Sequence, residues 1–206
     1  ITGQDSKDVL FAIEEKYDFI AMSFVRNRSN VEELRTLLSA NNASNIKIIS
    51  KIENQEGIEN LDEIIESSDG VMVARGDLGI EVPIEKLPVY QRDIVKKSMA
   101  QGKFVIVATH LLETMIENPF PTRAEVSDIF NSVRQRADCT MLSGETTIGK
   151  YPSKSVEMMT AGINEAGANM SYEHKEFSNA GLSVRDIEKK HLIKNALVTS
   201  ENLNAK

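Results

Sequence analysis

The sequence of 206 residues contains one cysteine, no tryptophan and only 5% aromatic residues. Because Cys139 stands alone, a framework of disulfides within the chain is excluded, and a reducing compartment is indicated. No apolar run approaches the roughly 20 residues that a membrane span needs, and no signal-peptide pattern opens the chain. We therefore expect a cytoplasmic protein that makes no membrane contact.

Positive charge is also scarce, with 24 lysines and arginines against 31 aspartates and glutamates and a net charge of −7. This acidic balance argues against non-specific binding to nucleic acid or to anionic membranes. The hydrophobic share of 41% is enough for one large core. Ile1 is not an initiator methionine, and Lys206 falls inside a helix-like pattern, so we expect both ends to continue in a longer chain.

What the sequence does contain is an alternation of short apolar runs and amphipathic patterns. The runs predict strands at residues 18–25, 46–53, 70–77, 103–109 and 139–145. The amphipathic patterns predict helices at residues 29–40, 57–68, 89–102, 122–137 and 153–170. This repetition indicates an α/β fold with a parallel sheet. The nearly continuous apolar character of the runs is typical of strands that are covered on both faces.

The chain is expected to divide into three segments. Residues 1–171 carry the strand–helix repeats, and within them Thr122 and Glu125 form a capping-box pattern. Residues 172–182 are polar and without a period, so we interpret them as a linker. Ser183 can cap a following helix, and because one helix cannot form a domain, residues 183–206 are expected to be the first helix of a further, truncated domain.

Polar side chains stand at the carboxyl ends of all five expected strands. In IKIISKIENQEGI, residues 46–58, strand alternation puts Lys51 and Glu53 on the same face as Ile49. The other strands end at Ser23, Arg75, Gly76, Asp77, Thr109, Ser143 and Glu145. Parallel β/α folds, barrels above all, hold their active sites at this end of the sheet. A salt bridge that closes a strand is the plain alternative for Lys51 and Glu53.

The chemistry of these residues converges on an anion and a metal. Glu53 and Asp77 can supply oxygens to Mg²⁺, which prefers a few carboxylates together with substrate oxygens and water. Without a cation the two carboxylates would repel, so Lys51 or a metal has to lie near them. A helix that starts at Gly76 could hold a carboxylate or phosphate with its free N–H groups, although a glycine turn is the alternative. Together these groups suit stabilisation of an enolate or of a transferring phosphoryl group.

With these residues in view, the chain resembles the pyruvate kinase family. IKIISKIENQEGI is similar to the signature around that family's catalytic lysine, and SDGVMVARGDLGIEVP, FVIVATHLLETMIENPFPTRAEVSD and ADCTMLSGETTIGKYP follow in the family's order. The resemblance covers residues 1–170 and, more weakly, the final helix. It implies a parallel (β/α)8 TIM-type barrel of which this chain holds about the last five β/α units. The first three strands, a lid domain and most of a C-terminal domain would lie outside the chain.

The resemblance also implies an activity, the transfer of a phosphoryl group from phosphoenolpyruvate to ADP, which gives pyruvate and ATP. Lys51 would neutralise the transferring group, and Glu53 and Asp77 would bind Mg²⁺ or Mn²⁺, while K⁺ would find its ligands outside this chain. The backbone amides of Gly76 and Asp77 would hold the substrate carboxylate. Thr109 would contact that carboxylate and lie near the proton path to the enolate carbon. The supporting polar network would consist of Ser23, Arg75, Ser143 and Glu145.

Two further residues stand out beside the resemblance. His110 follows Thr109 where the family commonly has glutamine, and a lone histidine is more often a satisfied neighbour than a catalyst. Arg123 is implied to reach across a subunit interface, since a homotetramer is the assembly that the resemblance suggests.

Two other functions stay open at this point. A Mg²⁺-dependent lyase or aldolase on a related barrel would also pair a glutamate with an aspartate to hold an enolate. A non-catalytic interaction fragment is the second alternative, because five strands without further partners leave two open sheet edges. On the pyruvate kinase reading, too, residues 1–206 alone are expected to be inactive.

Overall fold

The computed structural model describes residues 1–170 and 183–203, which fall into two compact units that meet between Asn169 and Met170. The first unit contains the sheet. In the second, the described part is helix α10 (Val184–Asn202), whose first turn receives a hydrogen bond from Asp186 N–H to the Ser183 hydroxyl. The predicted linker lies outside the described residues. None of the described helices combines the length and the apolarity that a membrane crossing needs.

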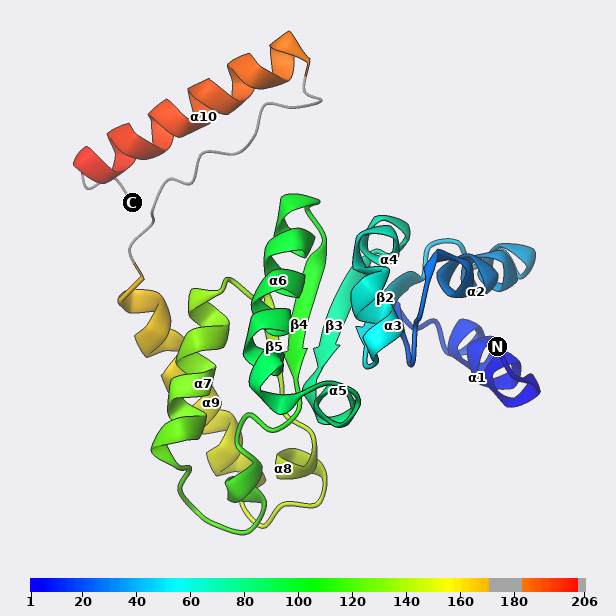
Figure 1. Cartoon of the computed structure of the whole chain (residues 1–206), viewed down its shortest axis with the longest axis horizontal. Helices are drawn as coiled ribbons and strands as arrows, with labels where there is room; N and C mark the ends of the chain where they lie inside the picture. Colours follow the sequence, from blue (N-terminus) through cyan, green and yellow to red (C-terminus); the bar gives the residue numbers. More distant parts are fainter. Residues whose placement is uncertain (171–182, 204–206) are drawn as a thin grey trace. The chain divides into compact units, whose positions relative to one another are not determined.

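Five parallel strands form one sheet in the order of the sequence (Figure 1). They are β1 (Phe19–Met22), β2 (Lys47–Ile52), β3 (Gly70–Ala74), β4 (Phe104–Ala108) and β5 (Cys139–Met141). Each strand pairs with the next along the chain, so the predicted parallel sheet is confirmed. Within the described residues β1 and β5 each have one neighbour, and the sheet is open.

The outer strands are shorter than the sequence predicts. β1 ends at Met22 because Phe24 adopts a left-handed backbone with φ of 53°. This conformation is costly for a residue other than glycine, and a hydrogen bond from the Phe24 amide to the Glu53 carboxylate accompanies it.

Helices follow the strands and cover the sheet. The longer ones are α1 (Gly3–Glu14), α2 (Arg28–Ala40), α6 (Leu87–Ala100), α7 (Arg123–Arg134) and α9 (Pro152–Ala168). Short helices are α3 (Gln55–Glu59), α4 (Leu61–Ser67), α5 (Arg75–Glu81) and α8 (Gly144–Thr147), with 3₁₀ turns η1 (Ile84–Lys86) and η2 (Glu113–Ile116). The predicted capping box of Thr122 and Glu125 is confirmed at the start of α7.

One helix prediction is wrong in its extent. The pattern over residues 57–68 forms two helices, α3 and α4, that meet at Asn60. Asn60 leaves the helical region with φ of −98° and ψ of 18°, and its side-chain amide donates to the carbonyl of Arg26 at 2.9 Å. This contact to a distant segment draws the chain out of the helix, which local sequence cannot reveal.

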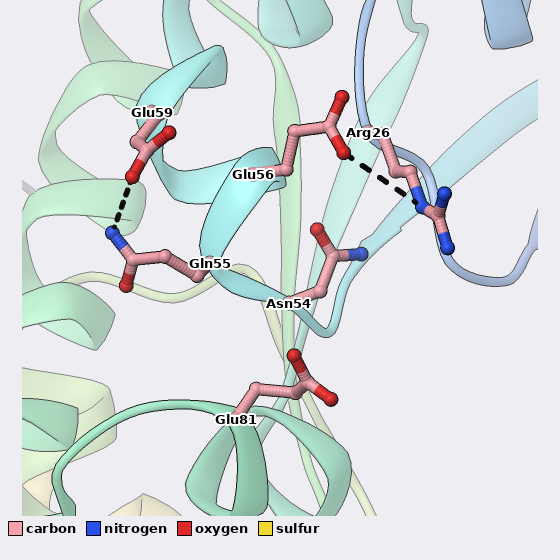
Figure 2. A pocket seen from close by; sticks show the side chains of 6 residues that line it. All are labelled: Arg26, Asn54, Gln55, Glu56, Glu59 and Glu81. Atoms are coloured by element: carbon pink, nitrogen blue, oxygen red, sulfur yellow. Dashed lines mark hydrogen bonds and ion pairs between the residues drawn. The ribbon is translucent and has the colours of Figure 1, made fainter.

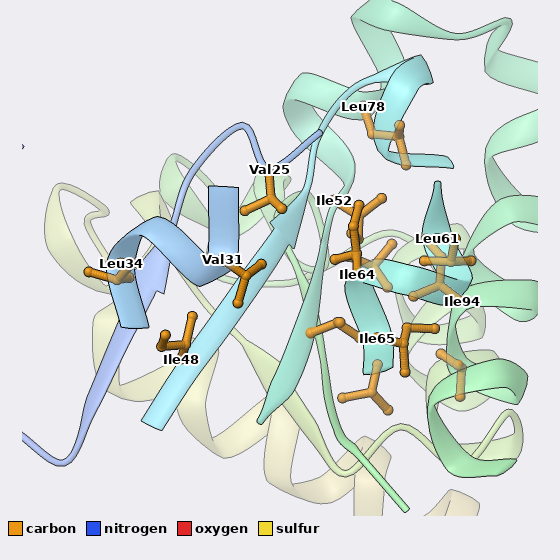
Figure 3. Close-up of a cluster of buried hydrophobic side chains, with 14 of the residues drawn as sticks. Val25, Val31, Leu34, Ile48, Ile52, Leu61, Ile64, Ile65, Leu78 and Ile94 are labelled. Carbon is orange, nitrogen blue, oxygen red and sulfur yellow. The ribbon is translucent and has the colours of Figure 1, made fainter. Parts of the chain in front are cut away.

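The core lies mainly on one side of the sheet. Ile48 and Ile52 of β2 pack there with residues of α2 and α4 in the largest buried cluster (Figure 3). On the opposite face a smaller cluster contains Ile49, Met72 and Ala108. The alternation predicted for β2 is therefore confirmed. Coverage of both faces holds for β3, whose five residues are all buried, but not for β1, whose residues are exposed or half-buried.

Candidate active site

The ends of β1 and β2 bring three predicted residues together. The Lys51 ammonium lies 2.6 Å from Glu53 Oε1 and donates a hydrogen bond to Ser23 Oγ at 2.9 Å. Glu53 is fully buried, whereas Lys51 is half-buried and Ser23 is exposed. The salt bridge that the sequence offered as an alternative is therefore present. It is part of a polar cluster at the carboxyl end of the sheet.

The buried carboxylate of Glu53 is only partly satisfied. Its Oε2 accepts the backbone N–H of Phe24 at 2.6 Å. Its Oε1 faces the Lys51 ammonium but accepts no hydrogen bond of regular geometry from the described residues. A buried carboxylate needs a compensating charge. Lys51 supplies one, and the unused acceptor capacity of Oε1 suits a second cation.

Asp77 offers a second carboxylate on the neighbouring strand connection. It lies in the first turn of α5, which follows β3 directly, and its side chain is exposed. Mg²⁺ usually takes one or two carboxylates and completes its shell with substrate oxygens and water. The orphaned oxygen of Glu53 and the exposed carboxylate of Asp77 fit that donor set. In the described part of the chain, no three His, Cys, Asp or Glu side chains gather to hold a metal by themselves.

Thr109 and His110 form a left-handed turn immediately after β4, with φ of 66° and 53°. Two adjacent non-glycine residues in this region store backbone strain, which is common at functional sites. The Thr109 hydroxyl accepts the N–H of Gly76 at 2.7 Å and donates to the carbonyl of Ala108 at 2.7 Å. The hydrogen bond from Gly76 to Thr109 occupies the amide that the resemblance assigns to the substrate carboxylate. A carboxylate could use that amide only if the Thr109 hydroxyl turned away.

The buried side chain of Arg75 supports the same turn through hydrogen bonds. It is 7% exposed, and its guanidinium donates to the carbonyl of Thr109 at 2.5 and 3.1 Å and to Asp128 of α7 at 2.5 Å. A further N–H donates to Gln91 of α6 at 3.3 Å. The planar guanidinium fork suits several fixed acceptors at once. Arg75 therefore joins β3, β4, α6 and α7, and its contacts are with the protein.

Glu145 has a similar bracing position at the end of β5. It is fully buried, and its carboxylate accepts the N–H of Leu112 at 3.1 Å and of Ser143 at 2.8 Å. Leu112 lies three residues after Thr109, so Glu145 links the end of β5 to the loop that begins with the left-handed turn. The predicted roles of Ser143 and Glu145 in a polar network stay predictions.

The first turn of α7 contains one further predicted residue, Arg123, and one that was not predicted, Glu125. Arg123 is exposed and makes no ion pair with another described residue, and its predicted interface role stays a prediction. Glu125, two residues on, was not among the predicted site residues. Burial raises the pKa of Glu125, but hydrogen bonds from Thr114 and Thr122 outweigh that effect, so its pKa lies below the ordinary 4.5. The capping pattern showed the contact with Thr122, whereas nothing local showed the contact with Thr114.

A polar pocket of about 530 Å³ lies at the start of α3. Figure 2 shows Glu81 at the end of α5 pointing toward Asn54, and Arg26 beside Glu56, with 3.9 Å between their charged groups. The lining residues are Arg26, Asn54, Gln55, Glu56, Glu59 and Glu81. The sequence did not indicate this pocket. Its excess of carboxylates makes it unsuited to a phosphate.

Comparison with known proteins gives consistent matches. A family model described as the pyruvate kinase barrel domain matches residues 1–156. A curated pyruvate kinase of Bacillus licheniformis is 54% identical over 159 residues, which cover 77% of this chain and 27% of that protein. The pyruvate kinase of Clostridium perfringens is 47% identical over 174 residues, 84% of this chain and 37% of that protein. The pyruvate kinase of Methanocaldococcus jannaschii is 50% identical over 179 residues, 87% of this chain and 39% of that protein. The chain thus spans well under half the length of these relatives.

Proposed function

The chain belongs to the pyruvate kinase family, and on this premise we propose that it is part of an enzyme that transfers a phosphoryl group from phosphoenolpyruvate to ADP. The observation that carries the proposal is the Lys51–Glu53 pair, which lies at the carboxyl end of a parallel sheet next to the strand that leads to Asp77. Closure of the sheet into a (β/α)8 barrel belongs to the proposal. The sequential order of the five strands supports it, with three strands to come from outside this chain. A cytoplasmic location and a homotetrameric assembly, which the resemblance suggests, also belong to the proposal.

Phosphoryl transfer depends mostly on positioning and on charge stabilisation. The ammonium of Lys51 has three N–H groups. One is donated to Ser23, and the ammonium forms an ion pair with Glu53. In our proposal a remaining N–H meets an oxygen of the transferring phosphoryl group. The two protein contacts fix the ammonium in place, so little reorganisation is needed when the substrate arrives.

Glu53 and Asp77 are proposed to hold Mg²⁺ or Mn²⁺, and the unused acceptor capacity of the buried Glu53 Oε1 supports this. When bound, the metal would supply positive charge that offsets the charge on the substrate oxygens. K⁺ is proposed to bind through residues outside this chain.

Thr109 is proposed to contact the substrate carboxylate and to lie near the proton path to the enolate carbon. Its hydroxyl is oriented by bonds to Gly76 and Ala108, and its carbonyl is held by Arg75. These bonds support a fixed orientation of the hydroxyl before substrate binds. The comparisons give no support to the lyase or aldolase alternative, nor to a non-catalytic fragment.

The test uses residues 1–206 alone and a chimera that carries residues 1–171 in the Bacillus licheniformis relative. Both are assayed for Mg²⁺-dependent turnover of phosphoenolpyruvate with ADP, beside aldol cleavage of 2-keto acids. We expect turnover from the chimera and none from residues 1–206. Lys51→Met in the chimera should lower kcat by several orders of magnitude while metal binding survives.

The matched control is Lys47→Met, which removes the exposed lysine at the opposite end of the same strand. Its kcat should stay near that of the parent chimera. A near-normal kcat for Lys51→Met would contradict the role assigned to Lys51. Activity from a monomer of residues 1–206 would contradict only the expectation that this chain alone is inactive, and would mean that five strands suffice for the chemistry.

A further inference from the structure

An aspartate stands directly before β3 and another before β5, and both make the same two contacts. The N–H of Asp69 donates to the carbonyl of Ile48 at 3.0 Å, and its Oδ2 accepts the N–H of Ile48 at 2.9 Å. The N–H of Asp138 donates to the carbonyl of Val105 at 3.0 Å, and its Oδ2 accepts the N–H of Val105 at 2.8 Å. Each aspartate thus binds both main-chain groups of the second residue of the preceding strand. We call this pair of hydrogen bonds the aspartate lock.

The aspartate lock fixes both the direction and the register of two parallel strands. The residue that it holds stands directly opposite the aspartate, because Ile49 pairs with Gly70 and Ile106 pairs with Cys139. A slip by one residue would turn every side chain to the wrong face of the sheet. It would also separate the carboxylate from its donor. Burial raises the pKa of Asp69, but the bonds from Ile48 and Arg35 outweigh this effect, so the pKa of Asp69 lies below the ordinary 3.8.

A third aspartate, Asp18, has the same position but lacks the contacts. It directly precedes Phe19, the first residue of β1, and its carbonyl accepts the N–H of Lys47 on the β2 side at 2.9 Å. On the other side, neither its N–H nor its carboxylate is bonded to another described residue, and it is exposed. The two groups that Asp69 and Asp138 use are therefore both unused in Asp18.

We propose that Asp18 is one half of a third aspartate lock, and that the outer edge of β1 receives a parallel strand whose second residue bonds to both groups. The inference rests on the proposed function, since the occupant is the strand of the barrel that closes onto β1 from outside this chain. The residue held by Asp18 is not proline, because its N–H is needed.

The sequence of the edge agrees with this assignment. β1 reads FIAM and carries no lysine or proline of the kind that protects natural edge strands from pairing, and Phe19 is 57% exposed. A second copy related by a twofold axis would place β1 antiparallel to β1, and that arrangement cannot form the aspartate lock.

The positions of the three aspartates also bear on how many strands a closed barrel would need. They precede β1, β3 and β5, whereas Ile46 and Lys103 precede β2 and β4 and offer no side-chain acceptor. The alternation continues around a closed sheet only when an odd number of strands lies between β5 and β1. The three strands of the proposed barrel satisfy that condition.

The experiment titrates residues 1–206 with a polypeptide that carries the first three barrel strands of the Bacillus licheniformis relative, and follows binding by calorimetry. Asp18→Ala should weaken binding about 10-fold or more, because it removes a charged hydrogen-bond acceptor. It should leave the thermal midpoint of the unbound chain unchanged. Asp8→Ala, at an exposed aspartate of helix α1, is the control for binding. Asp138→Ala breaks a lock that is already formed and should lower the midpoint of the unbound chain.

Hydrogen exchange gives a second readout, since the backbone N–H of residue 18 should become protected in the complex, and less strongly so in Asp18→Ala, which keeps this donor but loses the carboxylate. Equal binding by Asp18→Ala and Asp8→Ala would overturn the third lock while leaving the barrel intact. Failure of the native chain to bind the strands at all would overturn both the lock and the barrel. A dimer of residues 1–206 that Asp18→Ala dissociates would overturn the proposed occupant, because a second copy would then cover the edge.

Discussion

Replacing Arg75 by methionine should remove the main brace of the candidate site while keeping an unbranched apolar stem there. The change deletes the donors to the Thr109 carbonyl and to Asp128, which lie at 2.5 Å. Breaking a buried ion pair costs roughly 3–5 kcal/mol. The Asp128 side chain is 33% exposed, so water compensates part of its loss and the lower end of that range applies. We therefore expect the free energy of unfolding to fall by about 3 kcal/mol.

The assay is urea unfolding of residues 1–206, followed by circular dichroism because the chain has no tryptophan. Arg92→Met is the matched control, since Arg92 lies on α6 with a side chain that is 61% exposed and an exposed partner, Asp93. Its effect should stay below about 0.5 kcal/mol. A double-mutant cycle with Asp128→Ala separates the ion pair from the bond to the Thr109 carbonyl.

The loss of Arg75 should also have a local effect, on hydrogen exchange near Thr109. Without Arg75, the carbonyl of Thr109 in the left-handed turn loses its side-chain donors. The Gly76 amide, which donates to the Thr109 hydroxyl, should then exchange its hydrogen faster. The reasoning would be refuted by a loss below about 1 kcal/mol with an unchanged urea slope. Equal protection of the Gly76 amide in parent and variant would also refute it.

Three further predictions concern the metal, the pH and the subunit contact. In the chimera, Glu53→Gln or Asp77→Asn should raise the Mg²⁺ concentration needed for activity about 10-fold or more, whereas Glu59→Gln in the polar pocket should not; an unchanged titration would refute the metal site. The hydrogen bonds to the Glu125 carboxylate lower its pKa below the ordinary 4.5. They therefore stabilise the fold fully at a pH above 4.5, and this stabilisation is lost as the pH falls through the lowered pKa. The urea midpoint of the native chain should therefore fall more steeply in acid than that of Glu125→Gln, and parallel curves would contradict this. Arg123→Ala in the chimera should weaken the oligomer or change substrate cooperativity, and unaltered sedimentation together with unaltered kinetics would count against the interface.

The sheet could be predicted because its signals are local. β3 reads GVMVA, and all five residues are buried, as a continuous apolar run indicates. In β2, strand alternation alone separates Ile48 from Ile49, and the structure places them on opposite faces. The early end of β1 could not be predicted, because the left-handed Phe24 is bonded to a carboxylate that lies 29 residues away in the chain.

The places of the candidate site residues at the strand ends could be predicted, but their bonding could not. Lys51, Glu53 and Thr109 were chosen because the carboxyl ends of parallel strands meet at one edge, and their roles stay predictions. The partners of Arg75 were missed because Gln91 and Asp128 belong to helices whose position against the sheet no local pattern gives. The same is true of Glu145, whose carboxylate meets the amide of Leu112 33 residues before it.

The candidate site residues fall into a buried group and an exposed group. Glu53, Arg75 and Glu145 are buried and bonded to backbone groups of other segments, so this chain fixes their positions by itself. Ser23, which follows the edge strand β1, and Asp77, which follows the central strand β3, are both exposed. Side chains that act on a substrate need water excluded around them, and five strands leave that exclusion incomplete. The unused groups of Asp18 lie on the open edge of β1. The strand that would complete its lock would therefore also continue the sheet on the side of Ser23, which ties the shielding of the site to the pairing of β1.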